Sequence, residues 1–289
     1  MCSGIHGRAL PTASVRLDFD LSMSTSNTKA FDFASPAEWD VFYRQQQLDE
    51  HTYQTPNTEW HDSVALEDIA AAVPPNSTCL VVGCGTSRLP QVLLQQPAPP
   101  RSLIMLDTSP TCLERLKQLY GDTCGTTTMD YVCGDATQLT QYFATSSSSK
   151  NKINIDISCT TATTRGFKSY ATTATRESSV DIIVDKGLMD AILCSEGWDG
   201  PLERMLQEAS QVLKPAIGQY LLISYQLPRT TREFLVEVGR DVGLEWEYDV
   251  DLSVVAQGRQ AGDKVSSTDN KTTSGESRIN IALATKIPT

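Results

Sequence analysis

The chain has no apolar run that approaches the roughly 18 residues of a membrane-spanning helix, so we predict no membrane span. Basic residues are also outnumbered: 24 Lys and Arg face 35 Asp and Glu, a formal net charge of −11 at pH 7. We therefore predict no nucleic-acid partner, because binding to phosphates needs a basic surface. This charge favours a cationic substrate or a basic protein, unless the acid excess serves solubility alone.

Histidine is scarce, and the cysteines are not spaced like the ligands of a zinc site. The sequence has 3 His and 8 Cys, and no Cys-x-x-Cys pair occurs. No metal site is therefore predicted. Cys79, Cys84 and Cys133 lie inside or beside predicted strands, which is typical of small buried apolar side chains in a reducing compartment.

Three stretches are too rich in small polar residues to form a packed core. Residues 1–30 are interpreted as a disordered leader, or as a transit segment because they contain Arg, Lys and many Ser and Thr. Two low-complexity insertions are predicted at about 144–178 and about 257–275. The rest of 31–289 is predicted to be a single domain, which we expect to be monomeric and cytoplasmic, with a mitochondrial or other organellar location as the alternative.

The most informative stretch is 79–89. An apolar run ends at Val82, meets Gly83-Cys84-Gly85, and is followed by a helical pattern. This order predicts a buried strand and a glycine turn at the start of a helix, where the backbone can approach a ligand and offer free N–H groups. A second predicted strand ends at Asp107, roughly 20 residues later, the spacing expected of a carboxylate that binds a ribose.

Predicted strands alternate with helical patterns along the chain. The strands are expected at 79–82, 103–107, 129–133, 180–185, 218–225, 244–252 and 278–284. Such alternation predicts an α/β fold with a Rossmann-like, doubly wound, mostly parallel seven-stranded sheet. The last two strands have no helix between them, so we expect them to pair as an antiparallel C-terminal hairpin at the sheet edge.

Several helix ends are indicated by capping residues. Ser35-Pro36-Ala37-Glu38 is a capping box, and Asp62 or Ser63 is expected to cap the next helix. Ser109 precedes a proline and should begin a further helix, which Gly121 should end.

The order of these features resembles the class I, seven-strand S-adenosylmethionine-dependent methyltransferases. Three segments, 82–89, 134–139 and 185–191, resemble the eukaryotic subgroup that contains the lysine methyltransferases of elongation factor 1A and of citrate synthase. Asp185-Lys186-Gly187 with Asp190 after it is the most specific of these similarities, and Glu59-Trp60 occupies another motif position of the subgroup. The chain departs from the subgroup at Leu188, where a threonine is usual.

The resemblance implies S-adenosyl-L-methionine as cofactor. The residues it implies at the cofactor are Trp39, Tyr43, Trp60, Gly83, Cys84, Gly85, Asp107, Thr108, Asp135, Ala136 and Asp185. Asp107 would accept hydrogen bonds from both ribose hydroxyls, because a carboxylate offers two acceptor oxygens. Asp135 would accept from the adenine amine, and the N–H of Ala136 would meet a ring nitrogen. The alternatives are a helix-capping acid at Asp107 and a surface turn at Asp135.

Asp185 is the predicted catalytic residue. An acid at the end of a parallel strand lies where ligands of open α/β sheets bind, and it could hold an incoming amine by hydrogen bonding. The alternative is an acid that caps the following helix. Trp60, Trp39 and Tyr43 are expected to cover the cofactor and shape the amine entrance, with ordinary packing as the alternative. Neither Lys186 nor His61 is assigned a chemical role.

The predicted function is therefore methylation of a lysine side chain of a protein. Methylation of a small molecule by the same machinery is the first alternative. A nicotinamide-dependent oxidoreductase is disfavoured because Arg88 stands where its fingerprint needs a third glycine. A cofactor-binding scaffold without catalysis would not need the acids at Asp107 and Asp135.

Overall fold

The computed structural model describes residues 31–45, 59–143, 179–225, 227–256 and 279–288. The predicted leader at 1–30 lies outside the described residues, and so do both predicted insertions, at about 144–178 and about 257–275. Within those residues the strands are β1 (Thr78–Val82), β2 (Ser102–Asp107), β3 (Thr123–Cys124), β4 (Thr127–Cys133), β5 (Ile182–Lys186), β6 (Gln219–Tyr225), β7 (Leu244–Tyr248) and β8 (Ile279–Lys286). The helices are α1 (Pro36–Gln45), α2 (Leu66–Ala71), α3 (Leu89–Leu94), α4 (Pro110–Tyr120), the 3-10 helix η1 (Ala136–Gln138), α5 (Thr140–Phe143), α6 (Leu188–Leu193), α7 (Asp199–Val212), α8 (Arg229–Val242) and α9 (Leu252–Ala256).

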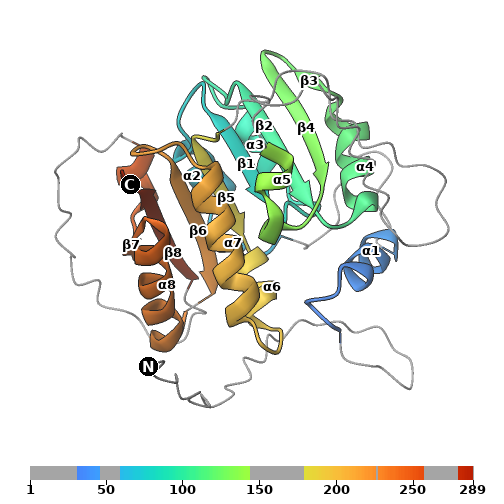
Figure 1. The fold of residues 1–289 in the computed structure, drawn as a ribbon. Coiled ribbons are helices and arrows are strands. Elements are labelled where there is room, and N and C mark those ends of the chain that lie inside the picture. Colours follow the sequence, from blue (N-terminus) through green and yellow to red (C-terminus); the bar gives the residue numbers. More distant parts are fainter. Residues whose placement is uncertain (1–30, 46–58, 144–178, 226, 257–278, 289) are drawn as a thin grey trace, which may run out of the picture.

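The described strands form one sheet in the order β3-β4-β2-β1-β5-β6-β8-β7 (Figure 1). The pairs from β4 to β6 are parallel, and the pairs at both edges are antiparallel. This confirms the predicted Rossmann-like, mostly parallel sheet and its antiparallel C-terminal hairpin. The prediction missed β3, which has only two residues and therefore too short a pattern to recognise.

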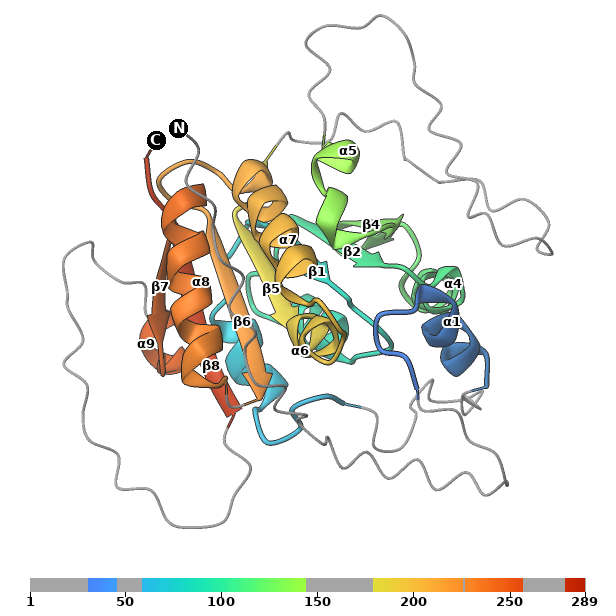
Figure 2. The same ribbon diagram turned by 60° about the horizontal axis from the view of Figure 1, so that its bottom comes forward.

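Helices cover both faces of this sheet because the strands are buried on both sides. Leu80 and Val82 of β1 belong to one core cluster with residues of α5, α6, α7 and α8, and Cys79 and Val81 belong to another with residues of α2, α3, α4 and α9. A central parallel strand therefore needs an unbroken apolar run, which is what the sequence shows. In Figure 2, α1 lies beside α4 at the end of the second layer.

The glycine-turn strand, β1, lies at the centre of the parallel region. It pairs with β2 on one side and with β5 on the other, so that Val82 is level with Leu106 and with Asp185. The carboxyl ends of these three strands therefore meet at one edge of the sheet. In open parallel sheets this edge is where ligands bind.

The capping predictions were right for α4 and wrong for α2. Ser109 accepts a hydrogen bond from the Cys112 N–H, and Gly121 ends α4 with a φ of 68°. Neither Asp62 nor Ser63 caps α2, which begins later, after Ala65, without a side-chain cap. The reason is a tight turn between them and the helix, in which the Val64 N–H donates to the His61 carbonyl.

Ser35 caps α1 as the capping box predicts. The Ser35 hydroxyl accepts from the Glu38 N–H at 3.4 Å, and the Glu38 carboxylate accepts from the Asp32 N–H at 2.6 Å. The strand predicted at 244–252 is too long. β7 ends at Tyr248 because Asp249 takes a left-handed φ of 57°, after which the chain enters α9.

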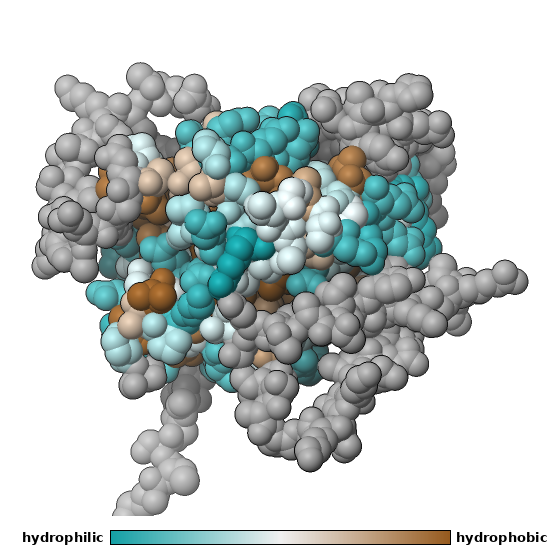
Figure 3. Space-filling model, turned by 90° about the horizontal axis from the view of Figure 1, so that it is seen from above, coloured by the Kyte–Doolittle hydropathy of each residue, from teal (hydrophilic) through white to brown (hydrophobic). Residues whose placement is uncertain are grey.

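The surface of the described part carries few large apolar side chains. The face in Figure 3 is mainly hydrophilic, with small separated groups of hydrophobic residues. Among the described stretches, no helix is both long and apolar enough to cross a bilayer. Cys79 and Cys84 are buried as predicted, and Cys133 is half-buried.

Candidate functional site

A cavity of about 320 Å³ opens at the carboxyl ends of β1, β2, β4 and β5. This volume lies at the lower end of the range of small-molecule sites. It is lined by ten of the predicted site residues, namely Trp39, Tyr43, Trp60, Gly83, Cys84, Gly85, Asp107, Thr108, Asp135 and Ala136. The structure therefore brings together residues that are up to a hundred positions apart in the chain, and Asp185 alone of the predicted set is absent from the lining.

The glycine turn forms the floor of this cavity. Gly83 and Gly85 have φ values of 56° and 50°, which L side chains rarely adopt. A Cβ at Gly83 would also lie 2.8 Å from the Leu188 Cβ, and one at Gly85 would lie 2.8 Å from the Tyr43 hydroxyl. The turn is held to β2 by the Cys84 N–H, which donates to the Leu106 carbonyl at 3.1 Å. Only glycine fits both positions without moving neighbouring side chains.

Asp107 ends β2 with its carboxylate between two backbone donors. The Gly85 N–H donates to Oδ2 at 2.9 Å, and the Ser109 N–H donates to Oδ1 at 2.8 Å. Burial raises the pKa of Asp107 to about 6, although these two N–H groups act in the opposite direction. The Thr108 backbone N–H lowers this pKa as well, so it is a third donor to the carboxylate. A carboxylate has about four acceptor positions, so it keeps capacity for a ligand donor such as a hydroxyl of a vicinal diol.

The turn after β4 forms the opposite end of the cavity. Asp135 Oδ1 accepts from the Thr137 N–H at 2.8 Å and so caps the short helix η1. The Asp135 N–H donates to the Tyr142 hydroxyl at 3.2 Å, and Tyr142 also packs against Gly134. Asp135 therefore occupies a turn, as the alternative interpretation had it, and also lines the cavity beside Ala136.

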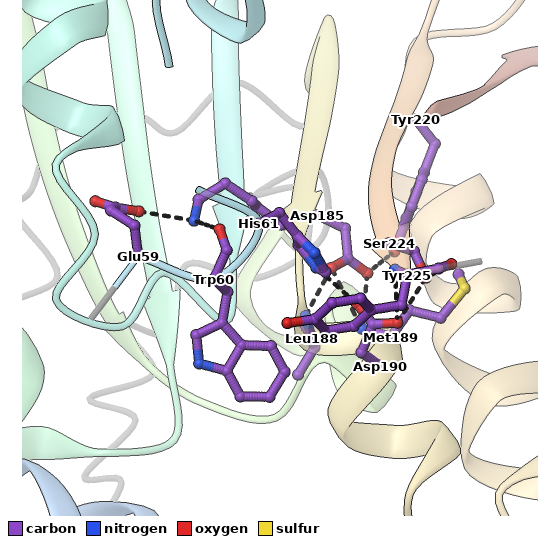
Figure 4. A network of polar contacts seen from close by, with 11 residues as sticks. Glu59, Trp60, His61, Asp185, Leu188, Met189, Asp190, Tyr220, Ser224 and Tyr225 are labelled. Carbon is purple, nitrogen blue, oxygen red and sulfur yellow. Dashed lines mark hydrogen bonds and ion pairs between the residues drawn. The ribbon is translucent and has the colours of Figure 1, made fainter. Parts of the chain in front are cut away.

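Asp185, the predicted catalytic residue, lies outside the lining of the cavity. Its carboxylate is fully buried, and it accepts from the Leu188 N–H at 2.8 Å, the Met189 N–H at 3.2 Å and the Tyr220 hydroxyl at 2.8 Å (Figure 4). Burial raises its pKa to about 7. Gly187, with a φ of 101°, lets the chain turn back so that the first N–H groups of α6 meet this carboxylate. Asp185 thus caps α6 from inside the protein, as the structural alternative predicted.

An aromatic cluster from α1 and the preceding residues covers the cavity. Trp39 stacks on Tyr43 with ring centroids 6.0 Å apart, and it lies 5.9 Å from Trp60. The Trp39 indole N–H donates to the Phe33 carbonyl at 2.9 Å, which fixes the ring. These rings pack on one another and also line the cavity, so their packing is confirmed and their place at a cofactor stays a prediction.

Lys186 pairs with Glu59. Its Nζ donates to Glu59 Oε2 at 2.8 Å and to the Trp60 carbonyl at 2.7 Å. Glu59 also accepts from the Ser87 hydroxyl at 2.9 Å and from the Arg88 N–H, both just after the glycine turn. A single carboxylate therefore ties the residues after β1 to the end of β5.

Sequence reasoning missed a second ionisable pair, between His61 and Asp190. The Nε2 of His61 lies 2.8 Å from Asp190 Oδ2, and both side chains are almost fully buried. Asp190 Oδ1 also accepts from the Ser224 hydroxyl at 2.6 Å. The position of Asp190 in the 185–191 segment was the available signal, but the partners are 129 residues apart and no local pattern joins them.

No protein-family model matches the sequence, and no curated protein sequence matches it. Among solved structures, the chain is similar to a methyltransferase of Haloferax volcanii in complex with the activator Trm112, with 17% identity over 87% of this chain and 98% of that one and a TM-score of 0.44. It is also similar to phosphoethanolamine N-methyltransferase 1 of Haemonchus contortus in complex with phosphoethanolamine and S-adenosylhomocysteine, with 13% identity, 88% of this chain, 48% of that one and a TM-score of 0.47. A third is a putative RNA methyltransferase of Pyrococcus horikoshii, with 12% identity over 87% and 96% of the two chains and a TM-score of 0.42. These identities and TM-scores are too low to transfer an activity to this chain.

Proposed function

We propose that the chain is an S-adenosylmethionine-dependent methyltransferase whose acceptor is a lysine side chain of a protein. The observation that supports this most is Asp107. It lies beside the glycine turn at the carboxyl edge of the sheet and lines the cavity. The two oxygens of one carboxylate suit the two hydroxyls of a ribose diol.

The remaining lining suits an adenosyl group and its methionine part. Asp135 would accept from the exocyclic amine of adenine, and the Ala136 N–H would donate to a ring nitrogen. The glycine turn at Gly83–Gly85 lines the cavity, where its backbone would lie against the methionine part. When bound, the cofactor supplies a methyl group on a positively charged sulfur.

Catalysis by this site would depend mainly on positioning. The residues of the cavity would hold the neutral acceptor amine in line with the methyl group that the cofactor supplies, and the proton that the amine releases would pass to water. Aromatic faces such as those of Trp39 and Trp60 favour nearby cations. Asp185 is assigned a supporting role in this proposal, because its oxygens are occupied by the N–H groups of α6 and the Tyr220 hydroxyl.

Two features support a protein lysine as acceptor. The formal net charge of −11 attracts basic surfaces. The 185–191 segment resembles that of the lysine methyltransferases named above. A small-molecule acceptor is the second candidate. It is favoured by the aromatic rings that cover the cavity, because they leave less room for a lysine that is attached to a polypeptide chain.

The test is transfer of labelled methyl groups from S-adenosylmethionine to an extract of the cells in which the chain is made. We expect label in a protein, at a lysine identified by mass spectrometry, and no label with Asp107→Ala. Label in small molecules would select the second candidate. A folded chain that neither binds the cofactor nor transfers label would contradict both.

A further inference from the structure

His61 has two features that cost free energy in the folded state. Its backbone φ of 59° is left-handed, although it is not glycine. Its Nδ1 is buried and has no hydrogen-bond partner in the described part of the chain. Backbone strain and unpaired buried groups persist where the surrounding structure enforces them, and they cluster at functional sites.

The surroundings that enforce this conformation are Asp190, Ser224 and Tyr225 (Figure 4). His61 Nε2 faces Asp190 Oδ2 at 2.8 Å, and in the tautomer with the hydrogen on Nε2 this N–H donates a hydrogen bond to the carboxylate. The other oxygen of Asp190 accepts from the Ser224 hydroxyl at 2.6 Å and from the Tyr225 N–H at 3.3 Å. The Tyr225 ring packs edge-on against the imidazole, with centroids 4.4 Å apart. Asp190 therefore joins His61 to the end of β6.

His61 is the last of three consecutive residues, Glu59-Trp60-His61, which we call the 59–61 strap. Glu59 fixes its beginning to Lys186 and to the residues after the glycine turn. Trp60 lies between these two anchors and lines the cavity. Trp60 packs so closely on Gly187 that a Cβ added at Gly187 would lie 2.8 Å from the indole ring.

The position of Trp60 relative to the strand ends indicates which part of the cavity it shapes. The proposed ribose and adenine acids, Asp107 and Asp135, follow β2 and β4, on one side of β1. Trp60 contacts Gly187, at the end of β5, on the other side of β1. The adenosyl group and the Trp60 ring therefore occupy opposite ends of the cavity.

We propose that His61 is a positioning residue of the methyl-acceptor side: by donating to Asp190 it holds Trp60 as the wall against which the acceptor is placed. His61 itself is not in the cavity lining and acts through Trp60. This inference rests on the proposed function, which it extends to the residues that hold the acceptor. The inference requires that Trp60 is held in place by the hydrogen bond from His61 to Asp190, and not by another property of the imidazole ring.

Two matched variants separate the hydrogen bond from the backbone strain. His61→Gln places an amide N–H near the Nε2 position and keeps the donor to Asp190. His61→Asn tolerates the left-handed φ better but is too short to reach Asp190. A folding requirement alone would favour the Asn variant, whereas the positioning role favours the Gln variant. Thermal unfolding shows that each variant is folded.

The readouts are cofactor affinity, methyl transfer and the environment of Trp60. Affinity is measured by calorimetry with S-adenosylhomocysteine, and transfer with labelled S-adenosylmethionine and cell extract. The environment is measured by fluorine NMR of fluorotryptophan-labelled protein, in which Trp60→Phe identifies the Trp60 resonance. The NMR readout does not depend on transfer, so it tests His61 even if the parent chain proves not to be a methyltransferase.

We expect both variants to bind S-adenosylhomocysteine within about threefold of the parent. His61→Asn should lose transfer by about 100-fold, as for a misplacement of about 1 Å, and should shift or broaden the Trp60 resonance. His61→Gln should keep the rate of methyl transfer and the Trp60 resonance close to those of the parent. The proposal is overturned if the Trp60 resonance is unchanged in both variants, or if His61→Asn transfers methyl groups as well as His61→Gln does.

Discussion

Asp107 and Asp185 hold matching places on either side of β1. Each lies at the carboxyl end of a strand that pairs with β1, and each accepts from two backbone N–H groups. Burial raises the pKa of both, to about 6 and about 7. Yet Asp107 lines the cavity and Asp185 does not.

The difference lies in which groups surround each carboxylate. The donors to Asp107 come from the glycine turn and from the residue before α4, so the carboxylate stays at the cavity edge. The donors to Asp185 come from its own following helix, and the Tyr220 hydroxyl takes a further position. An acid at a strand end is therefore a ligand candidate only if its remaining acceptor positions face the cavity.

The largest expected effect is on cofactor affinity. Asp107→Ala removes two hydrogen bonds to a charged acceptor, each worth roughly 1.5–3 kcal/mol, so the dissociation constant should rise by about 100-fold or more. Asp185→Ala should change it by less than about threefold. Calorimetry with S-adenosylmethionine measures both. Equal losses in the two variants would remove the distinction drawn between them.

The next effect is on stability and depends on pH. The pKa of Asp185 is raised to about 7 by burial, so its contribution to stability is full below the ordinary Asp pKa and is lost as the pH rises through 7. Asp185→Asn does not titrate. Between pH 4 and pH 8 the parent should therefore lose, relative to this variant, on the order of 3 kcal/mol of unfolding free energy. Denaturant unfolding at both pH values tests this, and a constant difference would contradict the burial of a titrating carboxyl.

A smaller pH effect is expected in cofactor binding. Only the ionised Asp107 accepts from both hydroxyls of a diol, and burial raises its pKa to about 6. Affinity should fall by about tenfold between pH 7.5 and pH 5. Asp107→Asn serves as the control, because its affinity should be lower and flat over this range. If the affinity of the parent and of the control changed with pH to the same extent, the titrating group would not be Asp107.

The smallest effect concerns the adenine end. Asp135→Ala should weaken cofactor binding by only about fivefold, because one hydrogen bond to a half-exposed acceptor is lost, worth about 1 kcal/mol. It should also loosen η1, whose first turn Asp135 caps. A loss as large as that of Asp107→Ala would shift the main polar recognition from the ribose to the base.

Much of the cavity lining could be predicted from the sequence because its residues lie next to strand ends. Gly83, Gly85 and Asp107 end or directly follow apolar runs, so each run brings its own residue to the carboxyl edge of the sheet. Asp185 also follows such a run, but the orientation of its carboxylate depends on Gly187 and on Tyr220, which lies 35 residues later. The predicted cap of α2 was wrong for a related reason: the tight turn at His61 makes the helix begin further along the chain.

The contact between His61 and Asp190 could not be predicted because the two residues are distant in the chain. His61 and Asp190 are separated by 129 residues, and the local sequence around either residue does not predict the other as its partner. Asp190 was part of a segment singled out by resemblance, and His61 follows a dipeptide that was likewise singled out. Their pairing depends on the parallel arrangement of β5 and β6, which only the folded chain provides.

The most direct test of the account is a crystal structure of the chain with S-adenosylhomocysteine. We expect both ribose hydroxyls within hydrogen-bond distance of Asp107, the adenine beside Asp135 and Ala136, and the sulfur facing the Trp60 side of the cavity. An adenosyl group bound elsewhere, or a ribose that leaves Asp107 without a new donor, would contradict it.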